Sequence, residues 1–253
     1  MFDKTKLKDN IYLYTFNGKD ELNVLVLLND DKALLIDSGY PTQAEVLKKE
    51  LEEDNIKPEI LINSHYHPDH VNGNFHFKGC KLMASEHYKM NYELFSALYP
   101  TVGYVEADEL IKDGNTLNFG QFELKFYNYP GHSKDSLVIV INDQLAHIGD
   151  LIMMTNDGKY RLPYMSFDGN IDDYVKSLKA LKKLQIPIFI PGHGQILDNQ
   201  ESTDQAIDFY NYYLEQFKRH GKQATVENCL GSSRDKCVML EYHDRNIKNI
   251  FRD

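Results

Sequence analysis

The sequence EILINSHYHPDH, residues 59–70, contains the densest run of histidine in the chain. Its apolar first half is typical of a short strand, so the histidines lie where a strand opens into a loop. Residues two apart at an extended strand end point to the same side, and His65 and His67 can therefore converge on one ion. Asp69 and His70 follow the turn that the proline helps to start, and they can face a second ion. This combination favours a site for zinc, iron or manganese over the alternative of a solvated polar loop.

Three further residues stand at the ends of apolar stretches, each beside glycine: His132 in PGHS, Asp150 in HIGD and His193 in PGHG. Glycine next to a ligand permits the tight turn that aims a short side chain inward. Taken singly, such a histidine is more often a loop residue, and such an aspartate is more often a helix cap. Together with the first cluster they form a coherent set of seven candidate metal ligands.

Strands and helices alternate on both sides of this motif. Strands are predicted in IYLYTF, LNVLVLL and ALLIDS, then helices from Thr42, a candidate cap, to Asp54 and from Ser85, another candidate cap, to about Leu98. From Glu109 to Gly149 the pattern returns to strands and predicts a second sheet. Helices follow at 171–184 and 202–220. Each half of the chain runs from antiparallel strands through a helix to a short strand whose loop carries histidine. One α+β domain, residues 1–253, with two facing mixed β-sheets and helices outside, is the economical architecture.

The amino-acid composition disfavours several classes of function. Acidic residues outnumber basic ones by 38 to 28, which disfavours a nucleic-acid partner. The apolar runs are far shorter than the ~20 residues of a membrane helix, and the charged N-terminal stretch does not look like a signal peptide, so we expect a cytoplasmic protein without membrane contact. Cys80, Cys229 and Cys237 suit neither a zinc ribbon nor a redox pair, and reduced, mostly buried thiols are expected.

With these residues in view, the chain resembles the metallo-β-lactamase superfamily and, within it, the glyoxalase II-like hydrolases. The resemblance extends from the LLIDSG stretch, residues 34–39, to the loop at His193, and it rests on the H-x-H-x-D-H motif. It implies the four-layer αββα sandwich of that family. It also implies that His65, His67 and His132 hold one metal, that Asp69, His70 and His193 hold a second, and that Asp150 bridges both. Asp37 matches a family aspartate that supports the site by holding a ligand imidazole; its alternative is an ordinary turn residue.

The chain departs from the family pattern after His132. Many members continue Gly-His-Ser/Thr-Pro-Gly-Ser, whereas this sequence reads GHSKDS over residues 131–136. Lys134 could offer a cation to an anionic substrate, or it could be solvated and paired with Asp135. Tyr66 and Tyr164 are further candidates for substrate binding, since a hydroxyl beside the site can stabilise a developing oxyanion.

These residues imply a hydrolase. Two divalent ions, zinc by expectation with iron or manganese suiting the same ligands, would share a bridging hydroxide, and Asp69 or Asp150 would act as catalytic proton acceptors. The expected substrate is a small acyl compound such as a thioester, ester or lactone. The alternative is an iron-dependent oxidoreductase of the persulfide dioxygenase kind, and a third reading is a metal-binding protein without activity. A homodimer is compatible with the sequence, and residues 225–253 could form a lid or a dimer contact.

Overall fold

The computed structural model describes residues 2–18 and 20–252. Its contacts divide the chain into two compact units: unit 1 comprises residues 1–128 with 139–142, and unit 2 comprises residues 129–138 with 143–253. Within the described residues, none of the helices combines the length and apolar character that crossing a bilayer requires.

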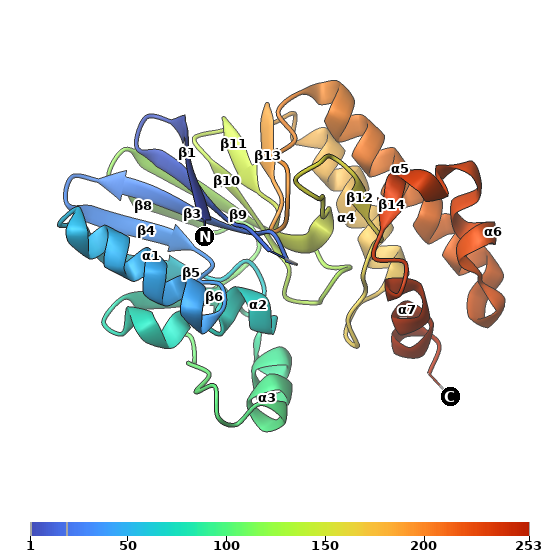
Figure 1. The fold of residues 1–253 in the computed structure, drawn as a ribbon, viewed down its shortest axis with the longest axis horizontal. Helices are drawn as coiled ribbons and strands as arrows, with labels where there is room; N and C mark the ends of the chain where they lie inside the picture. Colours follow the sequence, from blue (N-terminus) through green and yellow to red (C-terminus); the bar gives the residue numbers. More distant parts are fainter. Residues whose placement is uncertain (1, 19, 253) are drawn as a thin grey trace. The chain divides into compact units, whose positions relative to one another are not determined.

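Unit 1 contains a seven-stranded mixed sheet whose spatial order follows the chain (Figure 1). Strands β1 to β4 are antiparallel, while β4 to β7 are parallel to one another. The strands are β1 (Phe2–Lys8), β2 (Ile11–Phe16), β3 (Leu22–Asn29), β4 (Lys32–Ile36), β5 (Lys57–Ile62), β6 (Lys81–Ser85) and β7 (Glu109–Ile111). A further run of neighbouring strands consists of β8 (Thr116–Phe119), β9 (Phe122–Asn128) and β10 (Leu137–Ile141), where β8 and β9 are antiparallel.

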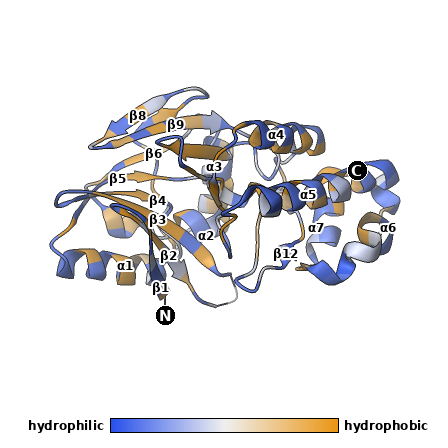
Figure 2. Cartoon of the chain, turned by 90° about the horizontal axis from the view of Figure 1, so that it is seen from above, coloured by the Kyte–Doolittle hydropathy of each residue, from blue (hydrophilic) through white to orange (hydrophobic). Residues whose placement is uncertain are grey.

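Helix α1 (Pro41–Glu53) covers the core of unit 1 with one face. Ala44, Leu47 and Leu51 recur at helical spacing and are all buried, whereas most of the helix is hydrophilic (Figure 2). Each fully buried leucine of this kind contributes about 1.5–3 kcal/mol. The prediction that Thr42 caps this helix is wrong: Tyr40 is the capping residue, because Pro41 has no N–H and fixes the first helical dihedral angle.

The other unit 1 helices are α2 (Pro68–Val71), the 3-10 turn η1 (Asn74–Phe77) and α3 (Lys89–Leu98). Ser85 does not cap α3, as the sequence suggested, because it is the last residue of β6 and Tyr88 precedes the helix. The predicted second sheet does not begin at Glu109 either. Residues 109–111 pair in parallel with β6 and extend the first sheet instead.

Unit 2 combines two parallel strand pairs with a helical C-terminal half. Strand β11 (Leu145–His147) pairs with β13 (Ile188–Ile190), and β12 (Tyr160–Arg161) pairs with β14 (Cys237–Val238). The helical elements are η2 (Gly149–Leu151), α4 (Ile171–Lys183), α5 (Gln200–His220), η3 (Gly221–Gln223), α6 (Val226–Leu230), η4 (Gly231–Lys236) and α7 (Tyr242–Ile250).

Helices α4 and α5 pack together through the apolar faces that the sequence predicts. Leu178 and Leu181 of α4 and Leu214 and Phe217 of α5 have no measurable exposure. Each helix starts at an asparagine whose side-chain oxygen accepts a backbone N–H three residues on, Asn170 for α4 and Asn199 for α5. Mixed sheets with separate helices confirm the predicted α+β class.

Candidate metal centre

The motif of residues 65–70 lies at the carboxyl end of β5, where parallel strands of the sheet end together. His65 and His67 occupy the extended segment after the strand, and His67 precedes the first residue of α2. Pro68 opens that helix, which places Asp69 and His70 in its first turn. His65, His67 and His70 are all buried, whereas the Asp69 side chain is 23% exposed.

Asp37, which follows β4 at the same end of the sheet, is fully buried and accepts three hydrogen bonds. One oxygen accepts the Ser64 backbone N–H at 2.7 Å, and the other accepts the Ser64 hydroxyl at 2.7 Å and His70 Nδ1 at 2.8 Å. The contact with His70 is the one expected of Asp37. Since a carboxylate only accepts, Nδ1 of His70 carries the proton, and Nε2, 3.7 Å from Asp69 Oδ2, is the nitrogen suited to a metal.

His65 is oriented by the hydroxyl of Ser64. The Ser64 hydroxyl donates its one proton to Asp37, so it can only accept from His65 Nδ1, which lies 3.1 Å away. The lone pair of His65 therefore resides on Nε2, which lies 3.0 Å from His67 Nδ1. Two nitrogens on one tetrahedral zinc ion lie about 3.3 Å apart, given Zn–N bonds of about 2.0 Å. The two nitrogens are close enough to reach one ion, and Ser64 is a supporting residue that the sequence analysis missed.

In unit 2 the candidate ligands Asp150 and His193 follow the parallel strands β11 and β13. The loops after these strands are joined by backbone hydrogen bonds from Gly192 N to Gly149 O and from Ile148 N to Ile190 O, at 2.7 and 2.9 Å. Asp150 lies in the 3-10 turn η2 and is buried. Its Oδ2 lies 3.4 Å from His193 Nε2 and 3.7 Å from His132 Nε2, so two imidazoles face one carboxylate oxygen.

His132 is oriented by the main chain. Its Nδ1 donates to the carbonyl of Tyr164 at 2.9 Å, which leaves the Nε2 lone pair directed to the Asp150 side. Gly131 supplies the turn: its φ is +149°, and a Cβ there would lie 2.4 Å from Cα of Tyr174. The prediction that glycine permits the turn beside this ligand is confirmed, because no other residue fits that contact.

The donor set fits a divalent metal. Histidine and aspartate side chains of both units are of the kind that could hold an ion. His65, His70 and His132 each have one ring nitrogen bonded to an oxygen acceptor, which is the arrangement typical of metal-bound histidine. Several buried imidazoles oriented in this way suit zinc, iron or manganese as the metal.

The three predicted substrate-binding residues differ in their surroundings. Tyr66 is fully buried among Tyr88, Tyr92 and Tyr104, and its hydroxyl donates to the carbonyl of Val105. Burial raises its pKa. These contacts assign Tyr66 to the core, which differs from the expectation that it lines the substrate pocket.

Tyr164 and Lys134 remain accessible. The Tyr164 ring is partly buried, with its centroid 5.6 Å from that of His132 and 5.0 Å from that of Tyr242. Lys134 is exposed in the loop after His132, and its backbone N–H donates to Asp168 at 3.2 Å. Both predictions stay open for these two residues.

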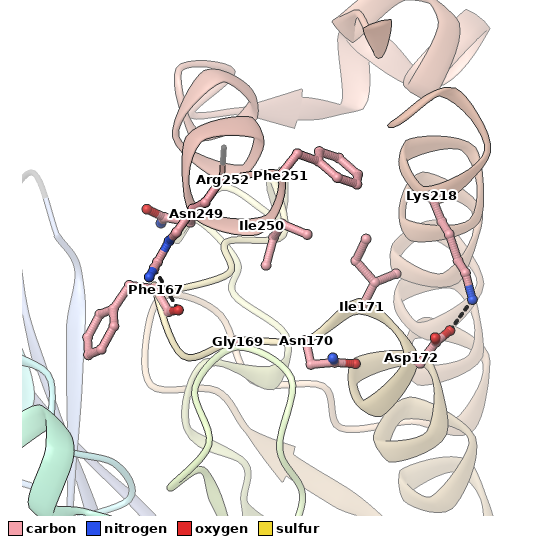
Figure 3. Close-up of a pocket in the computed structure, with 10 residues that line it drawn as sticks. All are labelled: Phe167, Gly169, Asn170, Ile171, Asp172, Lys218, Asn249, Ile250, Phe251 and Arg252. Carbon is pink, nitrogen blue, oxygen red and sulfur yellow. Dashed lines mark hydrogen bonds and ion pairs between the residues drawn. The ribbon is translucent and has the colours of Figure 1, made fainter. Parts of the chain in front are cut away.

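Unit 2 also contains a cavity of about 400 Å³ beside the C-terminal helix (Figure 3). Phe167, Gly169 and Asn170 lie on one side of it, and Asn249 and Arg252 come from the end of the chain. Lys218 of α5 is paired with Asp172 at the rim.

Solved structures of other proteins have a similar fold. Among solved structures, a metallo-beta-lactamase from Pontibacter korlensis superposes with a TM-score of 0.66 at 17% identity, covering 82% of this chain and 98% of that chain. The structural likeness confirms the predicted metallo-β-lactamase fold.

Several curated relatives are similar in sequence. A beta-lactamase-like protein 2 homolog of Caenorhabditis elegans is 26% identical over 193 residues, 74% of this chain and 60% of that protein. A hydroxyacylglutathione hydrolase of Pelagibacter ubique (strain HTCC1062) is 25% identical over 205 residues, 75% of this chain and 74% of that protein. The human persulfide dioxygenase ETHE1, mitochondrial, is 26% identical over 136 residues, 51% of this chain and 46% of that protein.

The family itself is identified by a sequence model. Residues 18–193 match the model described as the metallo-beta-lactamase superfamily, and this range includes all seven candidate ligands. The chain therefore belongs to the metallo-β-lactamase superfamily.

Proposed function

We propose that this protein is a metal-dependent hydrolase that cleaves a small acyl compound, a thioester, ester or lactone. The observation that carries the proposal is the orientation of the imidazoles: His65, His70 and His132 each have one nitrogen fixed by an acceptor, and two further contacts direct His132 and His193 to Asp150. The proposed ligands of two divalent ions are His65, His67, Asp69, His70, His132, Asp150 and His193.

Divalent ions held by these side chains would supply Lewis acidity and a nucleophile at neutral pH. The protein's own contribution is to fix the ligands and to move protons. Asp69, with its partly exposed side chain, and Asp150 are the carboxylates that we assign to accept a proton during the reaction. Tyr164 and Lys134 are the proposed substrate contacts, through a hydroxyl beside His132 and an exposed ammonium group.

A cysteine nucleophile does not fit the structure. Burial raises the pKa of Cys80 and Cys229 to about 11 and that of Cys237 to about 12, so these thiols stay protonated at neutral pH. All three are free of disulfide bonds, as the sequence predicts. The hydrolytic assignment therefore does not depend on the cysteines.

The name of the Pelagibacter relative, hydroxyacylglutathione hydrolase, supports a thioester as the first substrate to assay. We propose zinc as the metal, a small molecule as the substrate, a homodimer as a possible assembly and the cytoplasm as the location. The alternative, an iron-dependent oxidoreductase, is supported by the similarity to the persulfide dioxygenase, which covers only 51% of this chain.

Metal analysis of the purified protein separates these alternatives. The hydrolase predicts close to two zinc ions per chain and turnover in a panel of thioesters, esters and lactones. His65→Ala and Asp150→Asn should abolish that turnover, whereas Asp157→Asn, the same change in an exposed turn, should retain it. Iron as the main metal with oxygen consumption on a persulfide, or hydrolysis that survives both ligand substitutions, would overturn the proposal.

A further inference from the structure

We infer that the C-terminal helix α7 is part of the support of the metal centre: Asn246 and Asn249 hold the segment 163–166, whose Tyr164 carbonyl orients His132. We call these asparagines positioning residues, because their bonds go to segment 163–166, including the Tyr164 hydroxyl, and to Tyr213. The inference deepens the proposed function by adding residues beyond position 193, where the match to the family model ends.

The segment 163–166 contacts His132 twice. The Tyr164 carbonyl accepts from His132 Nδ1 at 2.9 Å, and the Ser166 backbone N–H donates to the His132 carbonyl at 2.8 Å. Both the ring and the main chain of the ligand are thereby fixed to this segment. A displacement of Tyr164 would change the direction of the His132 lone pair.

The segment has no regular structure of its own, so its backbone groups need side-chain partners. Asn246 Nδ2 donates to the Pro163 carbonyl at 2.7 Å, and its Oδ1 accepts the Met165 N–H at 2.8 Å. Asn249 Nδ2 donates to the Met165 carbonyl at 2.8 Å. The two amides therefore bond the residues on both sides of Tyr164.

Helix α7 is itself fixed to the rest of unit 2. His243 Nε2 bonds the Ala224 carbonyl at 3.0 Å, and its Nδ1 bonds the Tyr213 hydroxyl at 3.1 Å. Asn246 is fully buried and also donates to that hydroxyl at 3.2 Å. At the end of the chain, Arg252 donates to the Phe167 carbonyl at 2.7 Å, as Figure 3 shows. Helix α7 is thus held at several points, so the loss of the His243 bonds alone leaves Asn246 bonded to Tyr213 and Arg252 bonded to Phe167.

The test compares two pairs of variants in the full-length protein. Asn246→Leu and Asn249→Leu keep the branched shape of the side chain but remove the amide bonds to segment 163–166. Two control variants lie on the same helix. His243→Leu removes the His243 bonds to Tyr213 of α5 and to Ala224 but no bond to the segment. Asp244→Asn changes an exposed residue. For each, the Kd for zinc is measured by chelator competition, and the His132 ring nitrogens are assigned by NMR in the metal-free protein.

Each asparagine variant is expected to raise the zinc Kd by about tenfold, the lower end of the range for outer partners of a ligand, and to mix the two tautomers of His132. His243→Leu is expected to lower Tm but to change the Kd by less than about threefold, because it leaves the bonds of both asparagines to the segment in place. Asp244→Asn should change neither quantity.

An unchanged Kd in both asparagine variants, or an equal loss of affinity in His243→Leu, would overturn the inference. Asn249 is only partly buried, so Asn249→Leu keeps the test valid where Asn246→Leu does not fold. Both readouts are independent of turnover. A protein that binds zinc through His132 but hydrolyses nothing would refute the proposed function and leave this inference standing.

Discussion

The two clusters of candidate ligands are supported by different chemical groups. In unit 1 the acceptor behind His70 is the carboxylate of Asp37, which also binds the backbone and hydroxyl of Ser64. In unit 2 the acceptor behind His132 is the neutral main-chain carbonyl of Tyr164. A carboxylate both orients an imidazole and makes it a more basic ligand, whereas a carbonyl mainly orients it. The tautomer of a histidine is therefore fixed by a charged carboxylate in unit 1 and by a backbone carbonyl in unit 2.

The largest expected effect is at the carboxylate that two imidazoles face. Asp150→Asn keeps the shape but removes the charge, and hydrolysis should fall by about 10³-fold, since a metal ion contributes several kcal/mol to such a transition state. Turnover and bound metal are measured together. If Asp150→Asn kept full metal content and activity, the unit 2 cluster would not take part in catalysis.

The second prediction concerns the unfolding of the two units. Leu47→Ala in α1 and Leu214→Ala in α5 each empty a fully buried site and should cost about 2–5 kcal/mol. We propose that residues 1–253 behave as one domain, so both variants should shift a single cooperative calorimetric transition.

Val46→Ala, at a position that is 46% exposed on α1, is the control and should stay within about 0.5 kcal/mol of the parent protein. Two separate transitions, each shifted by only one of the leucine variants, would show that the units unfold independently.

The charged support is tested by Asp37→Asn. Asparagine tolerates the left-handed φ of 65° at this position, but its amide offers the wrong partner to either Ser64 or His70. The metal Kd should rise by about 10- to 100-fold. A rise no larger than the one caused by Asn249→Leu would remove the distinction between charged and main-chain support.

The smallest effect separates the partly buried thiol of Cys80 from the buried thiol of Cys237. Because their pKa values are raised, the thiolate fraction below pH 11 increases with pH, and so should alkylation by iodoacetamide. Cys80 should react faster than Cys237, because Cys80 is less buried and its pKa is raised less. Peptide mass spectrometry gives both rates. Equal rates that do not depend on pH would indicate that alkylation follows unfolding.

The sequence predicts some parts of the molecule better than others. The α+β class and the apolar faces of α4 and α5 are confirmed, because apolar periodicity is visible in the sequence. The family resemblance implied that Asp37 holds an imidazole of the site, and the structure shows that this imidazole is His70. Strand β1 was not predicted, since most of its side chains are exposed and polar. The role of the Tyr164 carbonyl was not predictable, because every residue has one, and the Asn246 bond to Met165 joins residues 81 positions apart.

Strand β1 also has a consequence for solubility. It forms one edge of the seven-stranded sheet, pairs only with β2 within that sheet, and carries lysine at positions 4, 6 and 8. Lysine along an edge strand discourages pairing with the edge of another molecule. Lys4 also bonds Glu50 of α1 at 2.9 Å, which ties the edge strand to the helix. Removal of residues 2–8 would leave the mostly buried β2, IYLYTF, as the new edge, and the shortened protein should then aggregate through its sheet.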